Sequence, residues 1–371
     1  MNKNEQINII ISGGGTGGHV FPAISIADTT KEHFKNANIL FIGSDNRLET
    51  TAVPKAGYAF EALPIRGLQR KISFKIFDTF FRLIKSIRIS RKIIKKFKPD
   101  IVVGVGGYAS AAVMHVATKK GIPTLIQEQN SFPGITNKML AKKVSAICVA
   151  YEEMDKFFPA DKLFVTGNPI RNLKSADVSK DEALNFFGLD KNKKTLFITG
   201  GSLGAKTINS SVIHNFNDIQ KANIQLIWQT GKRYYEEVRE FIEKQTNTDG
   251  IVVTKFIDRM DLAYKSADLV ISRAGAITIS ELALLGKAVV FVPSPNVAED
   301  HQTKNAEALV KLDAAVLIKD KDAKENLLPT AIKTINNSNK INKLSENISA
   351  YAKPNASNEI LKIIKKITIK K

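Results

Sequence analysis

The feature that most constrains this chain is a repeated order of an apolar strand-like run, a glycine-rich turn and a helical pattern. The apolar, β-branched run Ile7–Ser12 leads into the glycine cluster Gly13–Gly18, and a helical pattern begins near Pro22. Further strand-like runs follow at Ile39–Ile42, Ile101–Val105, Thr124–Gln127 and Ile147–Ala150. Alternation of this kind predicts a parallel sheet covered by helices.

The same order starts again in the second half of the chain. The run Thr195–Thr199 enters the glycine-rich segment Gly200–Gly204. Strand-like runs then follow at Ile224–Trp228, Ile251–Phe256, Leu269–Ser272 and Val289–Val292. With 371 residues, the chain exceeds what one core usually organises. An α/β fold of two Rossmann-like domains is therefore predicted.

The domain boundary is predicted near residue 168, because Gly167–Arg171 and the polar stretch after it carry no apolar periodicity. The domains would be residues 1–168 and 169–354. Asn336–Asn347 is polar enough to predict a loop with a frayed helix. After Pro354, a lysine-rich amphipathic pattern over about 355–371 predicts a final helix, which we assign to the first domain.

Composition indicates a globular protein whose positive charge reflects either an anionic partner or a general bias towards lysine. The chain is 43% hydrophobic and 25% charged, which is ordinary for a packed domain. Its single cysteine cannot form an internal disulfide, which fits a reducing compartment. The apolar run before the glycines is too short for a secretory signal or a spanning helix, so we expect neither export nor membrane insertion. The net charge of +19 leaves nucleic acid, anionic lipid and nucleotide phosphates as candidate partners.

The glycine loops indicate phosphate binding more than a dinucleotide site. Gly13, Gly15 and Gly18 match G-x-G-x-x-G, but the acidic residue expected at the end of the next strand is replaced by Asp45, late in a polar loop. Similar loops at Gly104–Gly107 and Gly200–Gly204 would suit a donor and an acceptor better than one dinucleotide. Backbone amides of such loops approach phosphates closely. The alternative is that these strand-to-helix turns simply favour glycine.

Two residues and one short segment near the starts of predicted helices are candidates for catalysis or substrate binding. His19 follows the first loop, where a general base would stand; the alternative is a histidine that caps or packs beside the loop. Glu281 would accept bonds from ribose hydroxyls, unless it is a solvated glutamate favoured by the helix dipole. The segment Asp300–Gln302 precedes another helix and is placed to contact sugar hydroxyls.

Motifs along most of the chain resemble those of one family. They are Thr16–Pro22, Gly106–Tyr108, Glu128–Asn130, Gly167–Arg171, Gly200–Ser202, Ala276–Glu281 and His301–Gln302. In type and order they resemble the MurG family, the UDP-N-acetylglucosamine:lipid I N-acetylglucosaminyltransferases of peptidoglycan synthesis. The resemblance implies a GT-B fold, with two Rossmann-like domains whose parallel sheets face a central cleft, inverting chemistry and no obligatory metal or cofactor.

The resemblance also implies the residues of two sites. The UDP-N-acetylglucosamine site would comprise Thr16, Gly17, Gly18, Asn130, Arg171, Ser202, Ile257, Ala276, Ile277, Thr278, Ile279, Ser280, Glu281 and Gln302. The undecaprenyl-linked acceptor, lipid I, would lie near Gly106, Gly107 and Tyr108. Leu203 stands where some relatives carry a polar residue, which puts a side-chain contact there in doubt.

The implied mechanism is a single displacement by the 4-hydroxyl of the muramyl sugar at the anomeric carbon. His19 is the first candidate for the base and Glu128 the second, because an imidazole with a pKa of about 6.5 suits proton uptake near neutrality. Loop amides, a helix N-terminus and Arg171 would hold the departing diphosphate. The triplet Asp320–Asp322 resembles the metal motif of other glycosyltransferases but lies in a charged loop, so we expect no metal there.

The segment Ser73–Lys98 predicts a basic amphipathic helix. Ile76, Phe80, Leu83, Ile87 and Ile94 form one stripe suited to packing on the domain. Beside it, Phe77, Phe81 and Ile84 are bordered by Lys85, Arg88 and Lys92, a pattern that fits an anionic membrane surface. We therefore expect a peripheral enzyme on the cytoplasmic face of the inner membrane. The alternative is that all these apolar residues are core.

Other functions remain open at this point. A UDP-N-acetylglucosamine epimerase, a glycolipid glycosyltransferase and a non-catalytic sensor of nucleotide-sugars would share the fold. Nucleic acid is not expected as a partner, because no recognition-motif spacing accompanies the basic residues.

Overall fold

The computed structural model describes residues 6–65, 75–170, 178–297 and 300–369. The side chains of residues 75–80 and 369 are likewise outside the description. The chain forms two compact units: Met1–Asn172 together with Lys353–Lys371, and Leu173–Ala352. The sequence analysis placed these divisions near residues 168 and 354.

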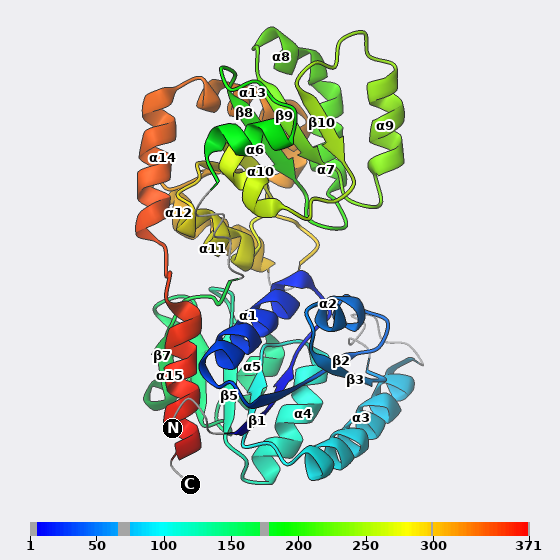
Figure 1. The fold of residues 1–371 in the computed structure, drawn as a ribbon, viewed down its shortest axis with the longest axis vertical. Coiled ribbons are helices and arrows are strands. Elements are labelled where there is room, and N and C mark those ends of the chain that lie inside the picture. Colours follow the sequence, from blue (N-terminus) through cyan, green and yellow to red (C-terminus); the bar gives the residue numbers. More distant parts are fainter. Residues whose placement is uncertain (1–5, 66–74, 171–177, 298–299, 370–371) are drawn as a thin grey trace. The chain divides into compact units, whose positions relative to one another are not determined.

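The first unit is built on a parallel sheet of seven strands in the order β3-β2-β1-β4-β5-β6-β7 (Figure 1). The strands are β1 Ile7–Ser12, β2 Ala37–Ser44, β3 Ala59–Leu63, β4 Ile101–Gly104, β5 Thr124–Glu128, β6 Ala146–Val149 and β7 Leu163–Val165. The helices are α1 Gly17–His33, α2 Glu49–Lys55, α3 Lys75–Phe97, α4 Tyr108–Lys119, α5 Ile135–Leu140 and, from the end of the chain, α15 Ala356–Ile369.

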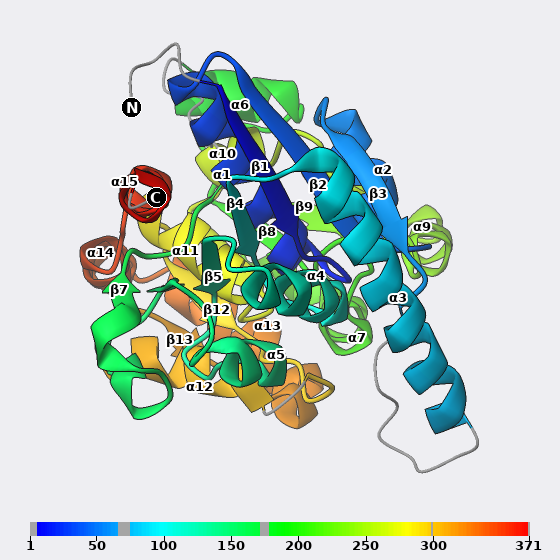
Figure 2. The same cartoon turned by 90° about the horizontal axis from the view of Figure 1, so that it is seen from below.

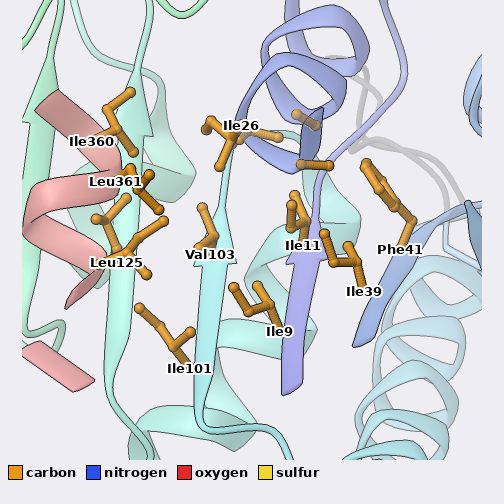
Figure 3. Close-up of a cluster of buried hydrophobic side chains, with 14 of the residues drawn as sticks. Ile9, Ile11, Ile26, Ile39, Phe41, Ile101, Val103, Leu125, Ile360 and Leu361 are labelled. Atoms are coloured by element: carbon orange, nitrogen blue, oxygen red, sulfur yellow. The ribbon is translucent and has the colours of Figure 1, made fainter. Parts of the chain in front are cut away.

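The core of this unit explains why its strands carry continuous apolar runs. Ile9, Ile11 and Val103 are fully buried, since helices cover the sheet. Ile360 and Leu361 of α15 join the same cluster, so residues more than 300 positions apart share one core (Figure 3). Burying each such side chain contributes about 1.5–3 kcal/mol.

The second unit repeats the design with six parallel strands in the order β10-β9-β8-β11-β12-β13. These are β8 Thr195–Thr199, β9 Gln225–Gln229, β10 Ile251–Thr254, β11 Leu269–Ser272, β12 Val289–Phe291 and β13 Val316–Leu317. The helices are α6 Lys180–Phe186, α7 Lys206–His214, α8 Phe216–Lys221, α9 Tyr235–Glu243, α10 Met260–Ser266, α11 Ala276–Leu284, α12 His301–Val310, α13 Ala323–Ile335 and α14 Ser338–Ala350. The predicted pair of Rossmann-like sheets is confirmed.

The strand orders locate one expected ligand-binding position in each unit, at the carboxyl ends of two central strands. In the first unit, β1 connects to β2 on one side and β4 connects to β5 on the other, so the strand order reverses between β1 and β4. In the second unit, the order reverses in the same way between β8 and β11. Open α/β sheets bind ligands at the carboxyl ends of such a strand pair. The glycine loops after β1, β4 and β8 lie at these two places.

Two local expectations were wrong. Helix α1 begins at Gly17, so Pro22 lies inside it instead of near its start. Residues 338–350 form the regular helix α14, whose N-cap Asn337 accepts a hydrogen bond from the Lys340 amide. Leu344 and Ile348 are fully buried one turn apart, and this contact stabilises a helix whose remaining surface is polar.

Candidate active site

The loops after β1 and β4 pack closely against each other. A Cβ atom on Gly107, where φ is +85°, would lie 2.7 Å from the carbonyl oxygen of Gly14. One on Gly13 would lie 2.1 Å from Cγ2 of Val105. Glycine at these two positions is therefore required by the close approach of the loops, beyond any general preference of strand-to-helix turns.

His19 stands where these two loops meet. Its Nδ1 atom lies 3.1 Å from the carbonyl oxygen of Gly14 and 3.5 Å from Oγ1 of Thr16. A carbonyl oxygen only accepts, so the contact with Gly14 requires a proton on Nδ1 and leaves the lone pair on Nε2. Nε2 is directed at Gly106, where an added Cβ would come within 2.8 Å of it. The half-buried imidazole thus has a fixed orientation and a basic nitrogen.

Glu128, at the end of β5, is 2% exposed and accepts hydrogen bonds on both carboxylate oxygens. One oxygen accepts from the amide and the side chain of Asn130, at 3.0 and 3.2 Å. The other accepts from the amide of Gly134 at 3.0 Å and from Nδ2 of Asn137 at 2.9 Å. These contacts favour a role in shaping the loop after β5 over the base role that we considered for Glu128.

A buried amide network links the neighbouring strand ends. Nε2 of Gln129 donates to the carbonyl of Val105 at 2.9 Å, and Nε2 of Gln127 donates to Oδ1 of Asn168 at 3.0 Å. Nδ2 of Asn168 in turn donates to the carbonyl of Gln129 at 3.1 Å. The network holds the loop that precedes Tyr108, whose side chain is 42% exposed at the start of α4.

Glu49 is a residue of this site that sequence reasoning missed. It is the first residue of α2 and is 1% exposed. Its carboxylate accepts from the amides of Gly15 at 2.9 Å and Ser44 at 3.0 Å. A glutamate in a first helical turn usually faces solvent, so its sequence position carried no signal of burial.

In the second unit, the loop after β8 offers exposed backbone and side chains. Ser202 is exposed and Leu203 is 73% exposed, while the carbonyl of Ser202 accepts from the Lys232 amide at 3.2 Å. A Cβ on Gly204, where φ is +81°, would lie 2.1 Å from the carbonyl of Thr230. The loop is therefore held tightly against the end of β9.

Helix α11 presents its N-terminus at the end of β11. Its N-cap is Gly275, and no side chain among the described residues caps it. The amides of Ala276, Ile277 and Thr278 are therefore available to an anion. Glu281, two residues beyond Ile279, is 5% exposed and accepts a hydrogen bond from the hydroxyl of Tyr264 at 3.1 Å. The solvated alternative for Glu281 is wrong, because Tyr264 of α10 and the packed helix enclose it.

Two further predicted residues are held by hydrogen bonds in this unit, one after β10 and one near the end of β12. The amide of Ile257 donates to Oε1 of Gln229 at 2.8 Å, and Gln229 donates to Oγ1 of Thr199 at 2.9 Å. Oε1 of Gln302, in the first turn of α12, accepts from the amide of Ser294 at 2.8 Å. The side chains of Gln229 and Gln302 therefore each hold the backbone of a loop in this unit.

The side chains of two predicted contact residues are not described by the structure, whereas the metal-like triplet is. Arg171, and the side chain of Phe77, lie outside the described residues. Asp320 of the metal-like triplet contacts Nη1 of Arg273, and its other oxygen accepts from Oγ1 of Thr207 at 3.0 Å. Both oxygens of that carboxylate are thus engaged by protein groups.

On α3, the described part of the predicted membrane face is exposed. Phe81 is 67% exposed, Ile84 is half-buried, and Lys85, Arg88 and Lys92 are exposed. The opposite side of the helix buries Ser86, Ser90 and Ile94 towards α4. The alternative that Phe81 belongs to the core is therefore wrong.

Comparison with known proteins agrees with this geometry. The N-terminal domain of glycosyltransferase family 28 matches residues 9–149, and the family's C-terminal domain matches residues 195–366. A protein of Parabacteroides distasonis named UDP-N-acetylglucosamine--N-acetylmuramyl-(pentapeptide) pyrophosphoryl-undecaprenol N-acetylglucosamine transferase is 54% identical over 99% of this chain and 100% of its own length.

Solved structures show the same architecture. The crystal structure of Acinetobacter baumannii MurG superposes with a TM-score of 0.76 at 27% identity, covering 97% of this chain and 99% of that one. A putative UDP-N-acetylglucosamine 2-epimerase from Listeria monocytogenes has a TM-score of 0.72 at 13% identity, covering 97% and 96%. The second likeness concerns the fold alone.

Two Rossmann-like units, each with a glycine loop at the carboxyl ends of its central strands, form the GT-B architecture, and the match to both domains of glycosyltransferase family 28 identifies a glycosyltransferase. The identity across nearly the full length specifies the kind of transferase. This chain belongs to the MurG family of UDP-N-acetylglucosamine--N-acetylmuramyl-(pentapeptide) pyrophosphoryl-undecaprenol N-acetylglucosamine transferases.

Proposed function

We propose that this protein transfers N-acetylglucosamine from UDP-N-acetylglucosamine to the 4-hydroxyl of the muramyl sugar of lipid I, forming lipid II with inversion at the anomeric carbon. The observation that carries the proposal is the 54% identity to a transferase of that name over 99% of the chain. In support, the glycine loops after β1, β4 and β8 lie at the carboxyl ends of the central strands of the two units.

His19 is the proposed base. Its Nδ1–H donates to the carbonyl of Gly14, which leaves Nε2 to take the proton of the attacking hydroxyl. Exposed Tyr108 and the backbone of Gly106 and Gly107 would contact the acceptor. Glu128 would act by holding Asn130 and the loop after β5.

The second unit would bind the donor. The open N-terminus of α11 and the loop at Ser202 offer amides to the diphosphate, so that negative charge on the departing UDP is stabilised without a metal. The ordered backbone at Ile257 would contact the uracil ring of the donor. The buried carboxylate of Glu281 would accept hydrogen bonds from the ribose hydroxyls. By the family resemblance, Ala276 to Ser280 and Gln302 of this unit would also contact the donor, as would Thr16, Gly17, Gly18 and Arg171.

The test is transfer itself. Purified protein is incubated with radiolabelled UDP-N-acetylglucosamine and a short-chain lipid I analogue, in the presence of EDTA. Labelled disaccharide lipid and an equal amount of UDP are expected. Release of UDP without a lipid product, or conversion of the donor to its epimer, would contradict the proposal and favour an epimerase. Donor binding with no turnover would favour a nucleotide-sugar sensor.

We further propose that the first unit contacts an anionic membrane surface, which would place the enzyme peripherally at the cytoplasmic face of the cell membrane. None of the helices in the described part of the chain is long and apolar enough to cross a membrane. Helix α4 lies between α3 and α5 (Figure 2), and burial, together with the positive charges of Lys119, Lys143 and Arg91, lowers the pKa of His115 on α4. The cations of α3 therefore continue across the neighbouring helices, which strengthens attraction to anionic lipid.

Vesicle sedimentation tests this surface. Phe81→Ser should reduce partitioning onto phosphatidylglycerol vesicles, because an exposed aromatic side chain inserts at the interface. Phe186→Ser is the matched control, since Phe186 of α6 is 60% exposed but belongs to the other unit. Equal partitioning of the wild type and the Phe81 variant would rule out the contact.

A further inference from the structure

A buried carboxylate lies directly behind the loop that holds His19. The side chain of Glu49 occupies a space that glycines leave open: a Cβ on Gly14 would lie 2.0 Å from Oε1 of Glu49, and one on Gly43 would lie 2.7 Å from its Cγ. Its two oxygens accept the amides of Gly15 and Ser44 at 2.9 and 3.0 Å. Glu49 therefore joins the end of β2 to the loop after β1.

The amide of Gly15 and the carbonyl of Gly14 belong to the same peptide unit. The N–H of this unit donates to Glu49, and its carbonyl oxygen lies 3.1 Å from Nδ1 of His19. One planar group thus connects a carboxylate to an imidazole. Because the peptide is rigid, fixing its N–H also fixes the direction of its C=O.

The connection is electronic as well as geometric. A hydrogen bond to an ionised acceptor is stronger than a neutral one and polarises the donor group. Chains of hydrogen bonds strengthen one another in this way, so the carbonyl of Gly14 becomes a better acceptor for the imidazole N–H. The tautomer of a histidine is set by the hydrogen bond that its other nitrogen makes.

We propose that Glu49 is a positioning residue for His19, acting through the Gly14–Gly15 peptide. It orients the carbonyl of Gly14, holds the proton of the neutral imidazole on Nδ1 and so keeps the basic lone pair on Nε2. This inference rests on the proposed function, in which His19 is the base. The competing explanation is that Glu49 only anchors the loop, so that its loss would lower the stability of the fold without changing catalysis.

The first test uses wild-type protein and needs no activity. Long-range ¹H–¹⁵N correlation spectra report the tautomer of each of the five histidines, and His19→Gln assigns the signal of His19. The neutral form of His19 should carry its proton on Nδ1. A proton on Nε2 would overturn the inference, whatever the variants do and whether or not the protein transfers sugar to lipid I.

The second test compares Glu49→Gln with Asp100→Asn. The control loses a carboxylate that also accepts a hydrogen bond from a backbone amide, that of Asn8 at 2.8 Å, but at the opposite, amino-terminal ends of the strands of the same sheet. In Glu49→Gln, kcat should fall about 10–100-fold with the KM for donor nearly unchanged, because the base is misplaced while the donor site is intact. The His19 signal should move towards a mixture of tautomers, and Asp100→Asn should change neither property.

The two explanations separate in this comparison. A Glu49→Gln protein that unfolds at lower temperature but keeps the wild-type kcat and the Nδ1–H tautomer would show that Glu49 only stabilises the loop. That result would overturn the inference. Glu49→Asp keeps the charge with a shorter reach, so a kcat between those of the wild type and Glu49→Gln is expected. If Glu49→Gln fails to fold, Glu49→Asp takes its place: wild-type kcat and an unchanged Nδ1–H tautomer in that variant would overturn the inference.

Discussion

Nε2 of His19 lies 2.8 Å from the point at which a Cβ on Gly106 would stand. Gly106 also has a φ of +100°, which L side chains rarely adopt. Gly106→Ala should therefore displace the imidazole and lower kcat about 100-fold, since a shift of about 1 Å costs that much in a positioned group. Steady-state transfer kinetics measure this effect.

The matched control is Gly121→Ala. Gly121 has a φ of +67° in the same unit, but a Cβ there meets nothing within 4 Å. Its backbone strain should cost about 1 kcal/mol of stability and leave kcat unchanged. Equal kcat values for the two variants would show that Gly106 does not restrain His19.

Removal of the imidazole is the direct test of the base. His19→Ala should lower kcat by roughly 10²–10⁴-fold with the fold intact. His33→Ala removes a histidine from the far end of the same helix and should keep wild-type kcat. A loss of less than about threefold in His19→Ala would remove His19 from that role.

Asp320 is predicted to be structural. Arg273 and Asp320 are both largely buried, and Arg273 also donates to the carbonyls of Val292 and Pro293 at 3.0 and 3.1 Å. Asp320→Ala leaves the guanidinium without its partner, which should cost about 3 kcal/mol in thermal unfolding. The transfer rate with EDTA should equal that with Mg²⁺ in both proteins. A rate restored by Mg²⁺ only in the wild type would instead make Asp320 a metal ligand.

Lys287 should make stability depend on alkaline pH. Burial, reinforced by Lys180 and Lys265 and opposed by Asp268, lowers the pKa of Lys287 to about 8. The unfolded chain keeps the proton to about pH 10.4, so between about pH 8 and pH 10 it binds more protons than the native state and stability rises with pH.

Chemical denaturation of the wild type and Lys287→Met across that interval measures the effect. The wild type should gain about 1–2 kcal/mol relative to the variant, which lacks the group. Parallel pH profiles for the two proteins would contradict the lowered pKa.

His115 should report on anionic membranes. Burial, followed by Lys119, Lys143 and Arg91, lowers the pKa of His115. A negative surface beside these cations favours the protonated form, so vesicles should raise the titration midpoint of His115 and bind more tightly as the imidazole becomes protonated at acidic pH. Neutral phosphatidylcholine vesicles are the control. A midpoint that phosphatidylglycerol vesicles leave unchanged would place the membrane contact elsewhere.

Strands with a continuous apolar run were predictable, including the edge strand β10, whereas the short or exposed edge strands were not. Runs such as Ile9–Ile11 are apolar without interruption, because helices cover both faces of a parallel sheet. The edge strands β3, β7 and β13 were missed. Most residues of β3 are exposed, β7 has three residues and β13 two, so each carries too little apolar pattern to be recognised.

The sequence by itself determined the two-unit architecture, the glycine loops and the positions of His19 and Glu281, because each of these leaves a local pattern in the chain. Only the tertiary structure decided what surrounds them. Glu281 is buried against Tyr264, and Glu49 meets Gly15 across 34 positions. The environment of a carboxylate depends on which segments the sheet order brings together, and no single stretch of sequence encodes that.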